Sequence, residues 1–377
     1  MPQALPPGLR RLGAAVAVCV MLVAGCSPAP DAPPVEVDPG TSAAAPPVAK
    51  LPITVGIADS DLLGLPRDEV VKAVELMKQL GVTTVRLLVP WAAIERTPDS
   101  YDWSMVDKTV DAVVAQRMSI LATLNSTPAW AVVPGQPAIA GRPASPAAFG
   151  SFAGRVAEHF RGKVSAYEIW NEPNGAAFFA PAPDPAGYTE LLKTAYPAIK
   201  AADPSAVVVA AGLGSVMDFS TILMNPVRFV STMYASGAKD FFDALAFHPY
   251  QYTTKFTDSV HPAAPINQLS GMRQLMLDNG DAHKKIWATE YGEPSSEVGE
   301  AAQAEFLADM LGKWRDLPYA GPVYVYTMRD RNSQSREPDD TLGIFRSDGT
   351  AKPAERVVTS YFSMRGSHLE GASPAPR

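Results

Sequence analysis

The sequence predicts a single closed (β/α)8 barrel, the TIM-barrel class of α/β proteins. Eight short runs rich in β-branched and apolar residues recur along the chain, and their starts lie 30 to 47 residues apart. That spacing leaves room for a helix and two loops after each run, as parallel strands with crossover helices require. The chain has no Gly-x-Gly-x-x-Gly after its first run and no Gly-Lys-Ser/Thr phosphate loop, which argues against the nucleotide-binding versions of a parallel sheet.

The eight runs are predicted to be the strands, in chain order. They cover residues 53–58, 83–89, 119–124, 166–171, 206–211, 243–248, 285–290 and 322–328. The segments between them have helical periodicity. The first helix opens near Pro66 and stops at Gly81, which suits a left-handed cap. The second begins at Ser104 with Asp107 three residues later, a start that resembles a capping box.

Composition excludes several classes of protein. The 377 residues are 47% apolar and 19% charged, which excludes disorder as the main state. With 32 Lys and Arg against 39 Asp and Glu, the chain has no overall positive field for nucleic acid. Its two cysteines lie within the first twenty-six residues, so neither a disulfide framework nor a Cys-rich zinc site is expected. The histidines have no metal-ligand spacing, and we expect neither a metal nor a cofactor.

The N-terminus has the layout of an export signal. Arg10 and Arg11 precede an apolar run over residues 12–24 that is too short for a permanent membrane span. The run ends in Val-Ala-Gly-Cys26, which resembles the lipobox of bacterial lipoproteins, so we expect cleavage before Cys26 and lipidation of that residue. An ordinary secretory signal with a coincidental cysteine is the alternative.

This interpretation divides the chain into four parts and places the protein outside the cytoplasm, held to the membrane by its lipid. The expected parts are a signal peptide over residues 1–25, a Pro- and Ala-rich linker over 26–50, the barrel domain over 51–365 and a flexible tail over 366–377. Nothing in the sequence indicates a protein partner.

Carboxylates stand at the ends of two predicted strands, where the chemistry of a barrel is located. The fourth strand runs into Asn171 and Glu172, and the seventh ends at Glu290. An acidic residue at the tip of a buried parallel strand must be hydrogen-bonded, paired or used by a ligand. Two carboxylates facing each other across the barrel mouth are what glycoside hydrolysis needs, because one protonates the leaving oxygen while the other attacks the anomeric carbon.

These residues resemble a known group of enzymes. Trp170-Asn171-Glu172-Pro173 on the fourth strand, with Glu290 on the seventh, is similar to the clan A glycoside hydrolases, which share a (β/α)8 fold and retain anomeric configuration. The resemblance covers nearly the whole domain, and families five and thirty-nine are the most similar. It also includes Arg86, Tyr101-Asp102-Trp103, Thr127-Pro128-Ala129-Trp130 and His248-Pro249-Tyr250.

The resemblance implies roles for the catalytic pair and its neighbours. Glu172 would be the general acid and base, and Glu290 the nucleophile. Asn171 would bind the sugar hydroxyl next to the anomeric centre. Arg86 would lie beneath Glu290 and keep it ionised, whereas Glu172, without such a partner, would stay protonated. The remaining expected substrate-binding residues are Trp91, Asn125, Trp130, His248, Tyr250 and Tyr326.

Several of these residues have plainer alternatives. His248 and Tyr250 would orient the carboxylates, but a barrel-tip histidine is often only a packing residue. For both Trp91 and Trp130, core packing and stacking on sugar rings stay open as alternatives. Clan members commonly carry a tryptophan on the eighth strand, which this chain lacks, so Tyr326 would take that place.

Two further carboxylates need separate interpretations. Glu168 is expected to be a buried structural group, and Glu293 a loop residue that caps a turn or touches substrate. Arg86 could also serve only to neutralise a buried acid for stability.

The sequence therefore predicts a retaining glycoside hydrolase that acts on extracytoplasmic poly- or oligosaccharides without a cofactor. The Ala- and Pro-rich composition is typical of high-GC actinobacteria, whose envelopes contain galactan and arabinan, so a galactofuranosidase or arabinofuranosidase is the leading substrate expectation. The alternatives are a β-glucan, xylan or exopolysaccharide hydrolase and a surface lipoprotein that binds glycans without turnover.

Overall fold

The computed structural model describes residues 54–363 and confirms the closed (β/α)8 barrel. All strand pairs are parallel, each strand pairs with the next in the chain, and β8 closes the barrel against β1. The strands are β1 Val55–Ala58, β2 Thr84–Pro90, β3 Ser119–Asn125, β4 Ala166–Asn171, β5 Val207–Gly214, β6 Ala244–His248, β7 Lys285–Tyr291 and β8 Ala320–Tyr326. Every predicted run corresponds to one of them, with ends that differ by at most three residues.

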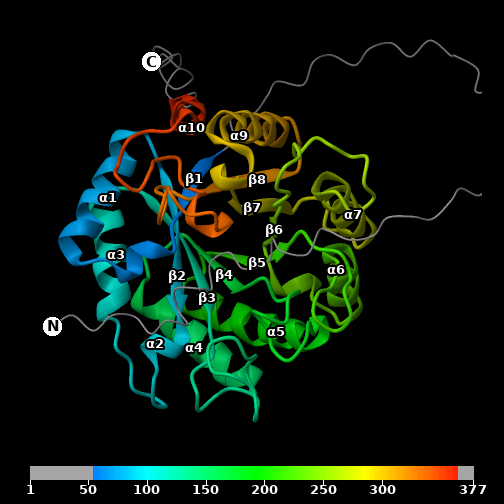
Figure 1. The fold of residues 1–377 in the computed structure, drawn as a ribbon. Helices are drawn as coiled ribbons and strands as arrows, with labels where there is room; N and C mark the ends of the chain where they lie inside the picture. The colour runs from blue at the N-terminus through cyan, green and yellow to red at the C-terminus, as the bar shows by residue number, and fades with distance from the viewer. Residues whose placement is uncertain (1–53, 364–377) are drawn as a thin grey trace, which may run out of the picture.

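Helices surround the sheet on all sides (Figure 1). They are α1 Arg67–Gln79, α2 Trp91–Ile94, α3 Ser104–Ala115, α4 Pro146–His159, α5 Pro185–Ala202, α6 Pro226–Ala235, α7 Pro265–Asp278, α8 Ser295–Val298, α9 Glu300–Arg315 and α10 Pro353–Ser363. Three short 3-10 helices, η1 Asp61–Gly64, η2 Lys239–Phe241 and η3 Pro338–Asp340, lie in the connections. No helix within residues 54–363 combines the length and the apolarity that a bilayer span requires.

The helix starts follow the sequence signals in part. Pro66 is the N-cap residue of α1, and Gly81 has the left-handed φ of +94° expected beyond its end. The capping box at Ser104 was wrong: Trp103 takes the N-cap position of α3, and Ser104 is already inside the helix. Asp102 instead accepts the backbone N–H of Ser104 at 3.1 Å, while Asp107 contacts the His159 ring at 2.7 Å.

Two layers of apolar side chains form the core. The outer layer fills the space between the sheet and the helices, and includes Trp91, Phe152 and Trp314. The inner layer fills the barrel itself with smaller residues and two tyrosines. Its members are Ala58, Leu121, Ala166, Val209, Ala244, Ala246, Tyr324, Tyr326 and Leu342. Above this inner layer the barrel is lined by polar and charged groups rather than apolar ones.

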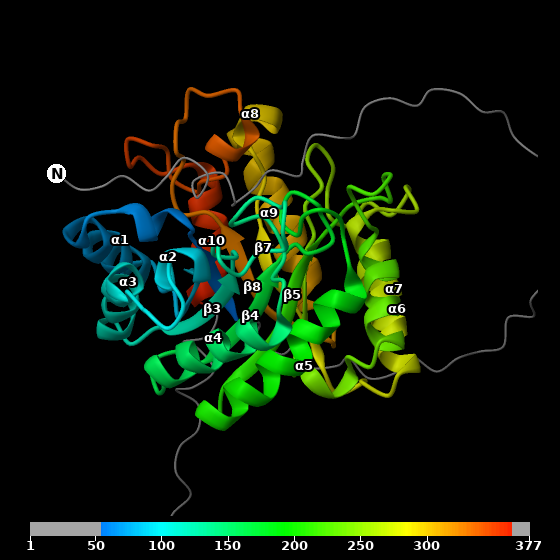
Figure 2. The same cartoon turned by 90° about the horizontal axis from the view of Figure 1, so that it is seen from below.

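Long connections follow the C-terminal ends of the strands. In Figure 2 the helix α8 and the orange segment after β8 lie together at the upper end of the molecule. This is the end at which β4 and β7 finish, so Glu172 and Glu290 are both carried to it. The predicted signal peptide, Cys26, the linker and the tail fall outside residues 54–363 and stay predictions.

Candidate active site

Arg86 is the central cation of the barrel mouth. It sits on β2 in register with Ala58 of β1 and is 2% exposed. Its Nε donates to Glu168 Oε2 at 2.7 Å, its Nη2 donates to Asn171 Oδ1 at 2.8 Å, and its Nη1 donates to Glu290 Oε1. A guanidinium presents its donors in one rigid plane, so Arg86 fixes the relative positions of three side chains from β4 and β7.

Glu168 is the buried partner of Arg86. Its side chain is fully enclosed and accepts four hydrogen bonds, from Arg86, Thr123, Thr289 and the backbone N–H of Gly212. Burial alone would raise the pKa of Glu168, but the charges of Arg86 and His248 and these hydrogen bonds hold it below its ordinary value. With every acceptor used inside the protein, Glu168 is a structural carboxylate in this geometry.

Glu290 is the last residue but one of β7 and accepts from two donors. Besides Arg86, the Tyr250 hydroxyl donates to Glu290 Oε2 at 3.0 Å. Burial and the neighbouring Glu290 carboxylate raise the pKa of Tyr250 well above its ordinary value, so the phenol keeps its proton and remains a donor. Glu290 is 2% exposed, and both of its donors, a cation and a phenol, come from within the protein.

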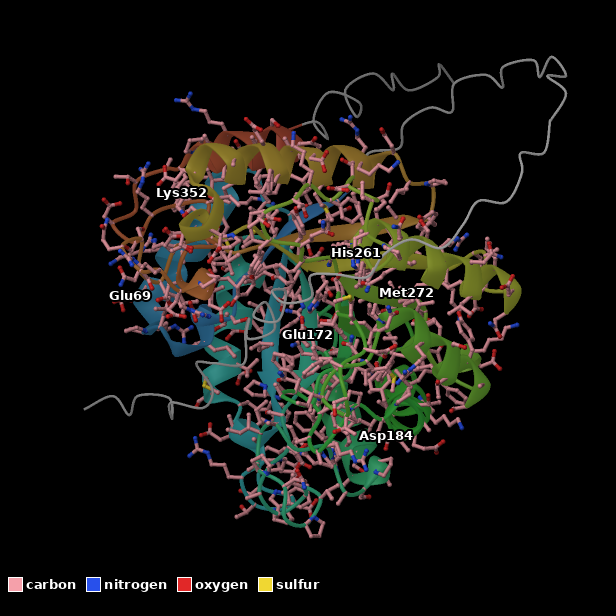
Figure 3. The ribbon with its side chains drawn as sticks, turned by 45° about the vertical axis from the view of Figure 1, so that its right-hand side comes forward. Glu69, Glu172, Asp184, His261, Met272 and Lys352 are labelled. Atoms are coloured by element: carbon pink, nitrogen blue, oxygen red, sulfur yellow. The ribbon has the colours of Figure 1, made fainter. Side chains whose placement is uncertain are left out.

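His248 connects the two carboxylates. Its Nδ1 lies 2.9 Å from Glu172 Oε1 and 3.9 Å from Glu290 Oε2. The expectation that His248 and Tyr250 orient the carboxylates agrees with these contacts, and Glu172, which has no arginine partner, is hydrogen-bonded to the imidazole of β6. In Figure 3 Glu172 lies near the middle of the view, while Glu69 lies at its left edge. The acids of β4 and β7 therefore converge on one ring nitrogen.

The backbone of β4 changes direction just before this contact. Trp170 and Glu172 have positive φ angles of 74° and 45°, which is uncommon for residues other than glycine. Such a conformation is kept only where its surroundings hold it, and it occurs most often at functional sites. Gly214 on the neighbouring strand lies beside the Glu172 carboxylate, and a Cβ there would be in ordinary van der Waals contact with it, at 3.4 Å.

The two asparagines differ in their contacts. Because Asn171 Oδ1 accepts from Arg86, any hydrogen bond from this amide to a sugar hydroxyl must be donated by Nδ2. Asn125 ends β3 and is 5% exposed, and its Oδ1 has no hydrogen-bond partner among the described residues. A buried acceptor without a partner at the barrel mouth is suited to a ligand hydroxyl.

The expected aromatic platforms are only partly in place. Trp91 is fully buried, stacks on Phe152 and donates its Nε1 to Glu95 at 2.6 Å, so it has no free face for a sugar and the stacking alternative was wrong. Tyr326 is 1% exposed and packs in the inner core, which gives it no open face either. Trp130 is 38% exposed and remains a candidate.

Tyr252 is an aromatic residue of the mouth that sequence analysis missed. It is partly exposed and meets Tyr250 edge to face with ring centroids 6.0 Å apart. Burial and the nearby Asp339, Glu293 and Glu172 carboxylates raise its pKa well above the ordinary value. The sequence signal that could have identified Tyr252 was its position two residues after Tyr250, in the loop that follows the sixth strand.

Glu293 was also misjudged. It is fully buried rather than a surface loop residue, and one oxygen accepts from Tyr291 at 3.0 Å while the other has no partner in the described chain. Burial raises the pKa of Glu293 well above its ordinary value. Its carboxyl group is therefore enclosed by the protein rather than exposed at the surface of a loop. Within residues 54–363, no group of three or more His, Cys, Asp or Glu is placed to bind a metal ion.

A second charged cluster borders the mouth between β1 and β8. Arg331 donates Nε and Nη2 to the Asp61 carboxylate at 2.8 and 3.1 Å, and Nη2 also donates to the Tyr326 hydroxyl at 3.0 Å. The neighbouring Asp59 follows β1, and burial raises its pKa to about 7. Deeper in the same connection, Lys352 donates to Asp330 at 2.7 Å in a fully buried pair that fixes the segment after β8.

Comparison with known proteins supports this assignment of the fold. A family model described as cellulase (glycosyl hydrolase family 5) matches residues 66–316. No curated protein sequence matches the chain.

Solved structures provide further fold relatives. A family 39 glycoside hydrolase from Bacteroides cellulosilyticus WH2 superposes with a TM-score of 0.68 at 21% identity; the match covers 83% of this chain but only 64% of that enzyme. A GH5_18 enzyme from Streptomyces cattleya, in complex with GlcNAc, has a TM-score of 0.63 at 16% identity and covers 87% and 83% of the two chains. An exo-β-1,4-mannosidase from an Opitutaceae bacterium has a TM-score of 0.60 at 19% identity over 86% and 61%.

These similarities at low identity show the fold, while the family match extends over most of the barrel. From a parallel eight-stranded barrel with carboxylates at the ends of β4 and β7, and from that match, it follows that the chain belongs to glycosyl hydrolase family 5.

Proposed function

We propose that this family 5 protein hydrolyses glycosidic bonds with retention, using Glu290 as the nucleophile and Glu172 as the acid and base. The observation that carries the proposal is the meeting of both carboxylates at His248. Glu172 Oε1 and Glu290 Oε2 lie 2.9 and 3.9 Å from the same nitrogen, so these two oxygens cannot be farther apart than the sum of the two distances. This upper bound is near the lower end of the roughly 6.5–9.5 Å between the carboxyl groups of inverting enzymes, and it allows the about 5–5.5 Å of retaining ones.

The proposed reaction has two displacements. In the first, a Glu290 oxygen bonds to the anomeric carbon while the bond from that carbon to the leaving oxygen breaks, and Glu172 gives its proton to the leaving oxygen. In the second, the Glu172 carboxylate takes a proton from water, the water oxygen bonds to the anomeric carbon, and Glu290 is released. Asn171 Nδ2 donates to the hydroxyl beside the reacting carbon.

The substrate proposal begins from the fold relatives. One is an exo-β-1,4-mannosidase, and another was solved with GlcNAc, so β-linked hexopyranosides are the first substrates to test. A furanoside substrate is supported by the composition of the chain alone. Parallel assays distinguish the pyranoside proposal from the furanoside one. The substrates are the aryl β-mannopyranoside, β-glucopyranoside, galactofuranoside and arabinofuranoside, and turnover of the furanosides alone would make a furanoside the preferred substrate.

Leaving-group dependence tests the mechanism. Glu172→Gln removes the proton donor, so we expect hydrolysis of alkyl glycosides to fall by about 10²–10⁴-fold, the usual contribution of general acid catalysis, while the first step on dinitrophenyl glycosides changes little. Equal losses on both substrate types would contradict the acid role. Saccharide binding without turnover of any substrate, unchanged in Glu290→Gln, would instead support the glycan-binding alternative.

Export and lipid anchoring remain part of the proposal. The lipobox-like sequence ending at Cys26 supports both, and the anchor would restrict the enzyme to extracytoplasmic saccharides.

A further inference from the structure

Thr289 stands one residue before Glu290 and contacts two groups at once. Its hydroxyl lies 2.6 Å from Glu168 Oε1 and 2.9 Å from His248 Nε2. Thr289, Glu168 and His248 are all fully buried. Water is therefore not available to complete these hydrogen bonds, and the donors and acceptors must match one another.

The direction of the first hydrogen bond follows from charge. Glu168 is ionised beside Arg86 and accepts from Arg86, Thr123 and the Gly212 N–H, so it can only accept from Thr289 as well. A threonine hydroxyl has one hydrogen atom, which points to Glu168. The Thr289 oxygen then faces His248 Nε2 with a lone pair, and the ring nitrogen must carry the hydrogen.

This orientation decides what the other ring nitrogen does. A neutral imidazole with hydrogen on Nε2 has a bare lone pair on Nδ1. Nδ1 is 2.9 Å from Glu172 Oε1, a hydrogen-bond distance that needs one proton between the two atoms. Either Glu172 is a carboxylic acid that donates to Nδ1, or His248 is an imidazolium that donates to a carboxylate. In both cases the pair holds one extra proton.

We propose that Thr289 is a positioning residue that locks His248 in the Nε2–H tautomer and thereby makes the Glu172–His248 pair retain the proton that Glu172 delivers. The inference builds on the proposed function, because it explains how the acid stays loaded although an imidazole is hydrogen-bonded to it. Thr289 acts through His248 and does not touch the reacting atoms.

The surrounding backbone packs closely against the ring. A Cβ on Gly212 would lie 2.0 Å from His248 Nε2, so the ring fills the space that this glycine provides. Gly212 N–H also donates to Glu168, which places the glycine, the carboxylate and the ring in one contact group. The ring is thus held between Glu172 on one edge and Thr289 on the other.

All charged groups around the pair belong to the same site. Burial alone would lower the pKa of His248, but Glu290 and Glu172 raise it above its ordinary value, and Arg86 acts in the opposite sense. The groups that face the ring or its partner are Arg86 from β2, Glu168 and Glu172 from β4, Tyr250 and Tyr252 after β6, Glu290 from β7 and Asp339 after β8. None of them contacts Nε2, which leaves that edge of the ring to Thr289.

Removing the Thr289 hydroxyl would allow His248 to adopt either neutral tautomer. In Thr289→Val, a neutral His248 can move its hydrogen to Nδ1 and donate to a Glu172 carboxylate, with no extra proton in the pair. The pair then loses its proton at lower pH. A hydrogen bond of ordinary strength corresponds to a downward shift of about 0.5–1 pH unit in the titration of the pair.

Nitrogen NMR tests the tautomer without any substrate. In protein labelled with ¹⁵N-histidine, and with His248 assigned by comparison with His248→Asn, we expect wild-type Nε2 to be protonated across the folded pH range, while the Nδ1 signal changes as the proton between Nδ1 and Glu172 is lost. Thr289→Val should bring the Nδ1–H tautomer into the neutral form, and Thr289→Ser should restore the wild-type pattern. Thr123→Val is the matched control, because it removes another hydroxyl donor to Glu168, at 2.7 Å, without touching His248.

Each outcome of the NMR experiment either supports or overturns the tautomer proposal. An unprotonated Nε2 in wild-type protein overturns the proposal by itself, even if Thr289→Val does not fold. An unchanged tautomer and titration in folded Thr289→Val, or the same change in Thr123→Val, also overturns it. Because this readout needs no sugar, absence of glycosidase activity would count against the proposed function and leave the tautomer result standing.

Activity provides the second readout. On any aryl glycoside that the enzyme turns over, the alkaline limb of kcat/KM reports loss of the acid's proton as pH rises. We expect Thr289→Val to move this limb to lower pH by about 0.5–1 unit for a poor leaving group, with Thr289→Ser and Thr123→Val at the wild-type position. A purely structural role for Thr289 would lower the rate at all pH values and leave the limb in place.

Discussion

At the residue scale, the site depends on one cation shared among three acceptors. Arg86 holds Glu168, Asn171 and Glu290 through separate nitrogen atoms, so the proposed nucleophile and the proposed substrate-binding amide are positioned by the same rigid group. Burying an arginine is favourable only if its charge is compensated. Glu168 provides that compensation from the protein interior, in addition to the contact between Arg86 and Glu290.

Glu168→Gln should therefore destabilise the fold. Removing one partner of a buried ion pair costs about 3–5 kcal/mol, and we expect a loss near the lower value because Arg86 keeps two other acceptors. Urea unfolding at neutral pH measures it. Glu158→Gln is the control, since it alters the exposed Arg155–Glu158 pair and should change stability little.

The pH dependence of that difference follows from the lowered pKa of Glu168. A carboxyl whose pKa is lower in the folded state contributes stability above its unfolded pKa and loses it as pH falls through the folded pKa. The gap between wild type and Glu168→Gln should be full at neutral pH and shrink below the ordinary glutamate value of 4.5. A gap that stays constant on acidification would show that Glu168 is not charged in the folded protein.

Residue by residue, the sequence indicated the charged part of the site better than the aromatic part. Strand-end positions located Glu172, His248 and Glu290, because a charged group in a barrel must point to its mouth or find a partner, and the family resemblance added Arg86 from within β2. Trp91 and Tyr326 could not be assigned, since a large ring beside a strand end can turn into either core layer. Thr289 has no distinctive spacing, and its contacts appear only once the closed barrel brings side chains of β4, β6 and β7 together.

At the element scale, the contact between β5 and β6 determines the position of His248, the hydrogen-bond partner of the proposed acid Glu172. The β5 strand bulges between Val209 and Gly212, and His248 at the end of β6 fills the space above Gly212. Strand order and helix placement followed from hydrophobic periodicity, which reports which face of each element is buried. The bulge and the N-cap of α3 did not, because they depend on contacts between distant residues.

Gly212→Ala tests this packing. The added methyl group would overlap His248 Nε2 and Thr289 Oγ1, with distances of 2.0 and 2.7 Å, so we expect about 1–3 kcal/mol of destabilisation and a displaced His248 ring. Gly312→Ala is the control within α9, where the nearest atom is Tyr361 Oη at 3.5 Å. A helix interior gains about 0.5–1 kcal/mol from that change. Thermal unfolding compares the two, and wild-type stability in Gly212→Ala would contradict the close contact.

At the scale of the whole molecule, closure of the barrel brings the chemistry together. Glu172 and Glu290 are far apart in the chain and meet because parallel strands all end at the same rim. The alternation of strand and helix was sufficient to predict this rim and the pair that stands on it. It was insufficient for the segment after β8, whose shape depends on the buried Lys352–Asp330 pair and the Arg331–Asp61 contact.

Anchoring is the other property of the whole chain. Cys26→Ser removes the predicted lipid acceptor, so we expect the protein to leave the membrane fraction while its activity per molecule is unchanged. Cys19→Ser lies within the expected signal and should leave the protein in the membrane fraction. Cell fractionation with immunoblotting measures both, and retention of Cys26→Ser in the membrane would contradict lipid attachment at that residue.

Trapping the covalent intermediate tests the central claim most directly. An activated 2-deoxy-2-fluoro glycoside of the sugar that the enzyme turns over should add one sugar mass to the protein, on the peptide that contains Glu290, because the fluorine slows release more than attack. Glu290→Gln should form no adduct, whereas Glu172→Gln should still form it. An adduct on a different carboxylate, or hydrolysis with inverted configuration and no adduct, would contradict the assignment of Glu290 as the nucleophile of a retaining glycoside hydrolase.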